Sequence, residues 1–216
     1  MDISIITFTL GGRDRYLAQC LNSVYNDINE QLIPNEFKVE HHVILQGVLQ
    51  TKEMNTILDF FKETGCYKLI VHEWPQNIGI GAGLNAILPQ CEGNLILKLD
   101  DDAKIVSTDF FESAISIHRR FPNSIFSPYP IGLVNNMGGP PGINRSIIHN
   151  SQTDSYTMIR YVNHVGGFAR FCPKSIFNKF TFTPDLISGV SGTEDGQLSQ
   201  YANINNITMF YVETGM

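Results

Sequence analysis

The amino-acid sequence predicts a single α/β domain over residues 1–216, with a mostly parallel twisted sheet and helices on both of its faces. Three observations support this fold class. Short apolar runs rich in β-branched residues alternate with stretches whose apolar residues recur at helical spacing. The resulting order, β-α-β-α-β-α-β, is typical of parallel strands joined by right-handed crossovers. The chain also has 43% apolar residues and no segment that reads as a linker, so it can bury one core.

The first half of the chain supplies the alternating elements. Strands are expected where β-branched and apolar residues cluster, at Ile3–Phe8, Val39–Leu45, Tyr67–His72 and Leu95–Leu99. Helices are expected between them, at about Asp14–Tyr25, Lys52–Glu63 and Ala82–Pro89. The first helix shows the pattern clearly, because Leu17, Leu21 and Val24 recur on one of its sides.

The second half is less regular. Helices are expected at Phe110–Phe121 and Glu194–Ala202, and strands at Ser124–Ser127, around Tyr161–Phe171 and at Ile207–Val212. Two segments rich in turn-forming residues are expected to be loops, Asn135–Ser155 and Asp185–Gly192. A loop as long as the first is unusual in a compact domain, so it is either a passive insertion or a functional segment such as a lid.

The composition excludes several classes of function. A net charge of −6 and the absence of a basic stripe argue against nucleic-acid binding. No apolar run approaches the roughly 20 residues of a transmembrane helix. The four cysteines are far apart and form no CxxC pair, so free thiols in a reducing compartment are expected: Cys20, Cys66, Cys91 and Cys172. The protein is therefore expected to be cytoplasmic, without a transmembrane segment.

Three consecutive carboxylates follow the fourth strand, Asp100, Asp101 and Asp102. In an open α/β sheet, ligands bind outside the carboxyl ends of the strands. Side chains alternate along an extended chain, so Asp100 and Asp102 should point to one side and Asp101 to the other. Paired carboxylates that face a crevice are hard oxygen ligands for Mg²⁺ or Mn²⁺, although an acidic turn exposed to solvent would have the same sequence.

Two other motifs leave alternatives open. Gly79, Gly81 and Gly83 resemble a dinucleotide fingerprint, but their spacing is not G-x-G-x-x-G and they follow the third strand, so an NAD enzyme is disfavoured. The acids Glu194 and Asp195 open a predicted helix. Acids in the first turn interact favourably with the helix dipole, yet a carboxylate held at a helix N-terminus is also well placed to act as a general base.

Taken together, the spaced motifs resemble family-2-type nucleotide-sugar glycosyltransferases with the glycosyltransferase A fold. The similar segments span most of the chain: Ile5–Thr9 with Arg13, Asn77–Asn85, Leu97–Asp102, Gly166–Phe171 and Thr193–Leu198. The third of these looks like the family's Asp-x-Asp motif, and the last looks like its Glu-Asp motif. The resemblance implies a donor-binding half at residues 1–105 and an acceptor-binding half at residues 106–216.

The resemblance further implies metal-dependent, inverting transfer of a sugar from a nucleotide diphosphate to a glycan or another hydroxyl acceptor. Asp102 would bind Mn²⁺ or Mg²⁺ directly, and Asp100 would bind the metal through water or bind the ribose. The cation would neutralise the diphosphate leaving group. Asp195 would deprotonate the acceptor hydroxyl. The rival from another class is a binding domain for nucleotides or carbohydrates that keeps the fold without turnover.

The remaining expected site residues divide into two sets. The donor set is Thr7, Phe8, Thr9, Arg13, Gln46, Asn77, Gly81, Asn85, Asp100 and Asp101. The acceptor set is Gly166, Gly167 and Glu194. Leu45 and Gln46 stand where many relatives carry an aspartate that reads uracil. Because an amide both donates and accepts hydrogen bonds, the base could be uracil, guanine or thymine.

Overall fold

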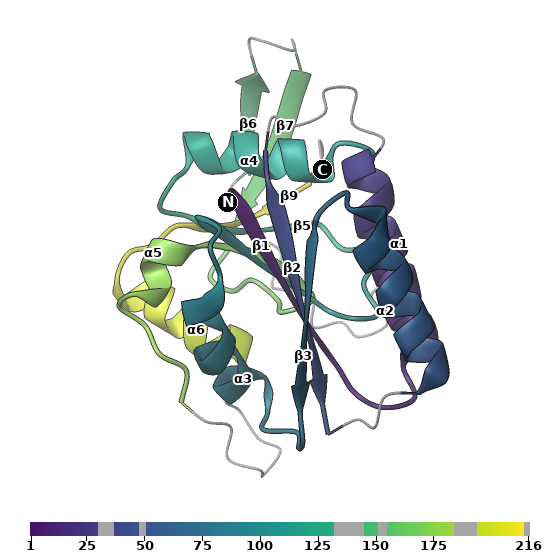
Figure 1. Cartoon of the computed structure of the whole chain (residues 1–216). Coiled ribbons are helices and arrows are strands. Elements are labelled where there is room, and N and C mark those ends of the chain that lie inside the picture. Colours follow the sequence, from purple (N-terminus) through teal and green to yellow (C-terminus); the bar gives the residue numbers. More distant parts are fainter. Residues whose placement is uncertain (30–36, 48–50, 132–144, 151–154, 184–193, 214–216) are drawn as a thin grey trace.

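One nine-stranded sheet runs through the whole molecule, in the order β3-β2-β1-β4-β8-β5-β9-β7-β6 (Figure 1). The computed structural model describes residues 1–29, 37–47, 51–131, 145–150, 155–183 and 194–213. The strands are β1 (Ile3–Thr9), β2 (Val39–Gln46), β3 (Lys68–Trp74), β4 (Leu95–Leu99), β5 (Ile125–Pro128), β6 (Arg145–Asn150), β7 (Ser155–Tyr161), β8 (Ala169–Pro173) and β9 (Met209–Val212). The helices are α1 (Asp14–Asn29), α2 (Lys52–Thr64), α3 (Ile80–Ile87) with the 3₁₀ turn η1 (Leu88–Gln90), α4 (Phe110–Arg120), α5 (Lys174–Phe177) and α6 (Glu194–Ile204).

The expected α/β class is confirmed, but the sheet is mixed rather than mostly parallel. The strands β3, β2, β1 and β4 pair in parallel, as the alternation of strands and helices predicts. By contrast, β8 runs antiparallel to both β4 and β5, and β7 runs antiparallel to both β6 and β9. Parallel neighbours need a crossover connection, and no helix separates β6, β7 and β8 in the described chain. The prediction extended the pattern of the first half too far.

The expected elements of the first half lie within a few residues of the observed ones. In the second half, the expected loop Asn135–Ser155 contains the whole of β6, which forms a hairpin with β7. The rest of that loop, residues 135–144 and 151–154, lies outside the described residues, as does the expected loop Asp185–Gly192. The strand expected around Tyr161–Phe171 is divided between the end of β7, a connection, and the start of β8.

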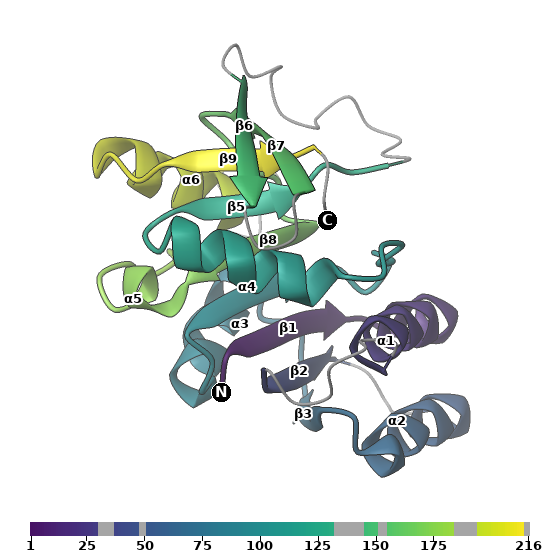
Figure 2. The same ribbon diagram turned by 90° about the horizontal axis from the view of Figure 1, so that it is seen from above.

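Helices cover both faces of the sheet (Figures 1 and 2). The apolar sides of α1, α2 and α4 pack on one face, where Leu21, Phe61 and Phe111 are buried. The apolar sides of α3, α5 and α6 pack on the other face, where Leu84 and Leu198 are buried. Because β1, β2 and β4 are parallel, their carboxyl ends meet at one edge, and the candidate functional residues gather there.

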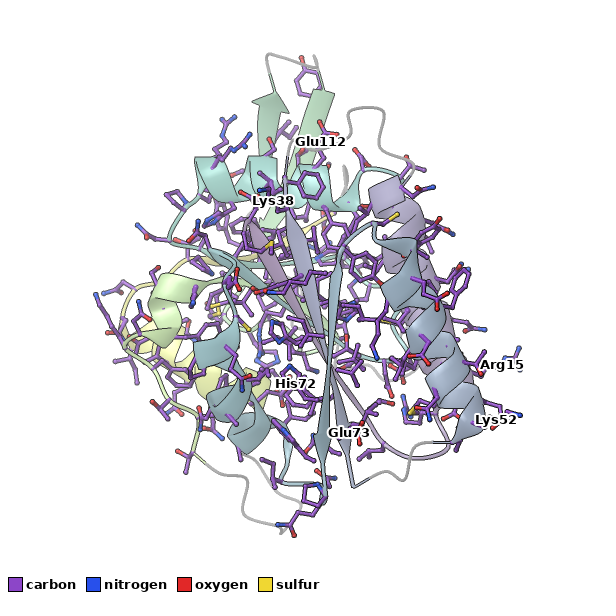
Figure 3. All side chains as sticks on the ribbon, viewed as in Figure 1. Arg15, Lys38, Lys52, His72, Glu73 and Glu112 are labelled. Atoms are coloured by element: carbon purple, nitrogen blue, oxygen red, sulfur yellow. The ribbon has the colours of Figure 1, made fainter. Side chains whose placement is uncertain are left out.

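The middle of β2 carries three buried polar residues between these two layers. The Nε2 atom of His41 lies 2.9 Å from the Thr7 hydroxyl, and His42 Nδ1 lies 2.9 Å from Nε2 of His72, whose side chain is labelled in Figure 3. Glu40 accepts a hydrogen bond of 2.5 Å from the hydroxyl of Ser4. Burial, followed by the charge of His42, lowers the pKa of His41 from about 6.5 to about 3. His41 is therefore neutral in the folded protein.

This buried histidine predicts an acid-sensitive fold. The unfolded chain binds a proton on His41 near pH 6.5 and the folded protein does not, so the free energy of unfolding should fall as the pH falls below 6.5. His41 alone should contribute a slope that approaches about 1.4 kcal/mol per pH unit. Urea unfolding at pH 7.5, 6.5 and 5.5 measures the slope in the parent and in His41→Asn, where it should be smaller by this amount. Equal slopes in the two proteins would show that His41 does not titrate on unfolding.

Candidate active site

The acidic tip of β4 is anchored through its middle residue, Asp101. The guanidinium of Arg13 donates two hydrogen bonds of 2.7 Å to this carboxylate, and the Thr9 hydroxyl donates a third of 2.7 Å. Asp101 is buried, and its contacts are separated from it by about 90 positions in the sequence. The hydrogen bonds that Arg13 donates to Asp101 and then to Asp102 raise the pKa of Arg13, so the guanidinium stays charged. The tip of β4 is thereby tied to the end of β1 and the start of α1.

The two outer carboxylates of the triplet border a cleft of about 650 Å³ at the end of β4 and β5. Asp102 has a side chain 52% exposed and accepts a hydrogen bond of 2.7 Å from Arg13. The lining also includes Tyr129 and Phe168. Asp100 and Asp102 thus face a common space, while Asp101 turns into the protein.

A buried lysine connects the first of these carboxylates to the start of α6. Lys98, which is 5% exposed, donates a short hydrogen bond to Asp100, and its Nζ lies 3.5 Å from Oε1 of Glu194. Burial raises the pKa of Asp100, while the charge of Lys98 opposes that rise. A single ammonium group therefore compensates two carboxylates from the two acidic segments that the sequence singled out.

The second acid of α6, Asp195, lies beside a histidine that sequence reasoning did not include. The Nε2 atom of His164 is 3.5 Å from Oδ2 of Asp195, and the backbone N–H of Gly196 donates a hydrogen bond of 2.8 Å to Oδ1. Both side chains are partly exposed. The two acids at the start of α6 therefore have different surroundings, since Glu194 lies over Lys98 and Asp195 faces His164.

His164 is held against Asp195 by the backbone on either side of it. Asn203 donates a hydrogen bond of 2.9 Å to the carbonyl oxygen of Asn163, and the N–H of Val165 lies 3.4 Å from the Ser199 hydroxyl. Asp195, Ser199 and Asn203 are four residues apart and form one stripe along α6. This repeat of polar residues at every fourth position is the sequence signal that could have indicated that another segment of the chain packs along this side of α6.

The expected acceptor residues Gly166 and Gly167 lie in the same connection. The N–H of Gly166 donates a hydrogen bond of 2.9 Å to the hydroxyl of Tyr211. A Cβ atom added to Gly167 would lie 2.6 Å from Oε1 of Glu194 and 3.5 Å from Nζ of Lys98. The glycine therefore permits the start of α6 to approach β4 and β8.

The expected donor residues at the end of β1 and β2 are only partly accessible. Thr7 is fully buried and bonded to His41, so its side chain belongs to the core rather than to the open edge. Gln46 is also buried, and its amide oxygen accepts a hydrogen bond of 3.0 Å from the N–H of Ile78. The amide that was expected to read the nucleobase is therefore buried in this structure. Phe8 is half-buried, with its ring against Gly83 and Trp74.

The turn that leads into α3 is built by its own polar residues. Asn77 accepts a hydrogen bond of 2.9 Å from the N–H of Gly79, and Gly81 is buried in the first turn of the helix. Asn85 exchanges two hydrogen bonds, of 2.7 and 2.9 Å, with the backbone of Phe182. Gly83 has no room for a side chain, because a Cβ atom would lie 2.6 Å from the ring of Phe8. Gly83 therefore permits close packing of α3 against β1, whereas Gly79 supplies the left-handed backbone angle (φ 82°) of the turn.

Asp100 and Asp102 are the residues that could hold a divalent cation. Within the described ranges, no group of three or more His, Cys, Asp or Glu side chains is arranged to bind one. A site of this kind nevertheless suits Mg²⁺ or Mn²⁺, which commonly take one or two protein carboxylates and complete their shell with water and substrate phosphates. The carboxylates of Asp100 and Asp102 therefore fit a cation whose remaining ligands are phosphate oxygens of a substrate and water.

Comparison with known proteins identifies the fold. No protein-family description and no curated protein sequence matches the chain. The structure is similar to that of residues 1–349 of TarS from S. aureus, with a TM-score of 0.67 and 21% identity over 99% of this chain and 60% of that one. A second structure of that protein contains UDP-GlcNAc, with a TM-score of 0.67 and 21% identity over 100% of this chain and 59% of that one.

The mannosyltransferase PcManGT from Pyrobaculum calidifontis is also similar, in its complex with GDP-Man and Mn²⁺. Its TM-score is 0.68, with 14% identity over 98% of this chain and 56% of that one. The chain thus spans somewhat more than half the length of the chains in these three structures and shares the A-type fold of nucleotide-sugar glycosyltransferases. None of the helices in the described residues is long and apolar enough to cross a membrane.

Proposed function

We propose that the protein is a metal-dependent, inverting glycosyltransferase that moves a sugar from a nucleotide diphosphate to a hydroxyl group of a glycan or glycoconjugate. The observation that carries this proposal is the buried ammonium group of Lys98. It contacts Asp100 of the β4 tip and lies 3.5 Å from Glu194 at the start of α6. The expected donor and acceptor motifs are therefore adjacent, as transfer between two bound substrates requires.

The donor would lie across the carboxyl ends of β1, β2 and β4. Phe8, Thr9 and Arg13 stand at the end of β1 and the start of α1, next to the β4 tip. Asp102, with Asp100, would hold the cation, which when bound neutralises the charge of the leaving diphosphate. The complexes of similar folds with UDP-GlcNAc and with GDP-Man and Mn²⁺ support a nucleotide-diphosphate sugar as the donor class.

The acceptor would lie toward the start of α6, near Gly166, Gly167 and Glu194. In the proposed step, the acceptor oxygen forms a bond to the anomeric carbon while the bond from that carbon to the diphosphate breaks. Asp195 takes the proton of the acceptor hydroxyl, and its contact with His164 and the Gly196 N–H fixes the direction of its carboxylate. One displacement from the opposite side inverts the anomeric centre.

Nucleotide binding should depend on the cation through Asp102. In a thermal-unfolding screen with UDP, GDP and dTDP, the parent should be stabilised by one of them more strongly when Mn²⁺ is present. Asp102→Asn should lose the Mn²⁺-dependent part of this stabilisation, which is at most about 2.7 kcal/mol for a ligand at 100 times its Kd. Its unfolding without ligand should change little, because the Asp102 side chain is 52% exposed.

The matched control for this experiment is Asp59→Asn, which removes an exposed carboxylate on α2 that pairs with Lys62. It should keep the full response to nucleotide and Mn²⁺. If Asp102→Asn also keeps it, the cation binds elsewhere.

A further inference from the structure

Both carboxylates that border the cleft are already paired with cations of the protein. Asp102 contacts Arg13 at 2.7 Å, and Asp100 contacts Lys98. A divalent ion that binds both carboxylates must compete with a guanidinium on one side and an ammonium on the other. Like charges at such separations repel appreciably even at the dielectric constant of water. The ligand-free site is therefore poorly prepared for a cation alone.

The two protein cations differ in their freedom to leave. Lys98 is buried and also compensates Glu194, so its displacement would leave two carboxylates without a counterion. The Arg13 side chain is 34% exposed, and its contact with Asp102 involves only one of its nitrogen atoms. An ion pair with such exposure is worth at most about 1 kcal/mol, so the Arg13–Asp102 contact can break at little cost. The same nitrogen, Nη2, also donates to Oδ1 of Asp101, so turning it away gives up that hydrogen bond too. The hydrogen bond from Arg13 Nε to Oδ2 of Asp101 can persist while this happens.

We propose that Arg13 makes cation binding conditional on the nucleotide diphosphate. Without nucleotide, the guanidinium occupies Asp102 and keeps a divalent ion away. When a nucleoside diphosphate enters, Arg13 turns its outer nitrogen to a phosphate oxygen, which guanidinium groups bind well, and Asp102 becomes available to the cation. The inference rests on the proposed donor class, and it makes Arg13 a positioning residue that couples two ligands.

Direct measurement of Mn²⁺ binding tests this coupling without an activity assay. Electron paramagnetic resonance reports free Mn²⁺ in titrations of the full chain, with and without saturating UDP or GDP. The parent should bind Mn²⁺ weakly alone and at least tenfold more tightly with one nucleotide. Arg13→Gln should bind Mn²⁺ alone more tightly than the parent, by a factor on the order of ten, since it removes a cation beside Asp102. The factor by which nucleotide increases the Mn²⁺ affinity should be correspondingly smaller in Arg13→Gln than in the parent.

Arg15→Gln is the matched control, because it removes the same charge from an exposed side chain of α1 that points outward (Figure 3). Its Mn²⁺ affinity should stay close to that of the parent. If Arg13→Gln does not fold, Arg13→Lys replaces it in the titration. Lys retains a cation for Asp101 but cannot bridge Asp101 and Asp102 with one planar group.

The outcomes separate this inference from the proposed function. Equal Mn²⁺ affinities without nucleotide in the parent and both Arg13 variants would overturn it, as would tight Mn²⁺ binding by the parent alone. Absence of Mn²⁺ binding in every protein would also overturn it. If neither UDP nor GDP binds the parent, the proposed donor class fails, but the nucleotide-free comparison still decides whether Arg13 keeps the cation from Asp102.

Discussion

Replacing Asp195 with asparagine should reduce turnover by a factor on the order of 10²–10⁴ while folding and donor binding remain intact. An amide cannot take a proton from the acceptor hydroxyl. It can still accept the hydrogen bond that the Gly196 N–H donates, so the start of α6 should keep its geometry. The nucleotide-sugar donor is chosen by the thermal-unfolding screen, and the rate is measured as release of the nucleoside diphosphate together with the mass of the product.

The control must separate a general base from an acid that merely favours the helix dipole. Glu194 is unsuitable because it is buried over Lys98, so its substitution would disturb the site. Glu53 lies in the first turn of α2, is exposed, and does not line the cleft. If Asp195 has only a dipole role, both Asp195→Asn and Glu53→Gln should cost at most about 1 kcal/mol and leave turnover unchanged.

The same experiment decides between an enzyme and a binding module. A parent that binds donor and Mn²⁺ but releases no nucleoside diphosphate with any acceptor would favour the binding module. If the parent and Asp195→Asn have the same rate of turnover, another group takes the proton. His164 is then the next candidate, because its Nε2 lies 3.5 Å from Asp195 and its side chain is partly exposed.

The elements of the first half could be predicted because the information is local. A parallel strand buried on both faces is rich in apolar and β-branched residues, and β1 and β4 show this pattern. The hairpin of β6 and β7 escaped prediction because β6 follows a segment rich in Gly, Pro and Asn. Its place in the sheet depends on pairing with β9, which is about 50 residues away in the sequence.

The site could be located from the sequence, but its side-chain partners could not. The acid triplet after an apolar strand indicated the edge of the sheet at which the carboxyl ends of β1, β2 and β4 meet. The contacts that define the site join residues far apart, such as Arg13 with Asp101 and Lys98 with Glu194, and no local pattern encodes such pairs. Thr7, which was expected among the donor-binding residues, has a buried side chain for a physical reason. Helices cover both faces of this sheet, so even a polar residue near the end of β1 is buried.

Lys98→Met should be the most destabilising of the substitutions considered, with a loss of about 3–5 kcal/mol in the free energy of unfolding at pH 7. The methionine keeps most of the apolar stem but removes the ammonium group, so Asp100 and Glu194 lose their shared counterion. The loss should shrink as the pH falls toward 5. Without Lys98, the pKa of Asp100, already raised by burial, would rise further, and protonation would remove the uncompensated charge.

Urea unfolding at pH 7 and pH 5 measures this effect against two controls. Lys62→Met removes an exposed lysine on α2 that pairs with the exposed Asp59, and it should cost less than about 1 kcal/mol. The double variant Lys98→Met with Glu194→Gln removes one of the two unpaired charges and should recover part of the loss, which a double-mutant cycle quantifies. If the free energy of unfolding of Lys98→Met at pH 7 is within about 1 kcal/mol of that of the parent, the two acidic segments do not depend on this lysine. The proposal that the donor and acceptor motifs share Lys98 as a counterion would then be wrong.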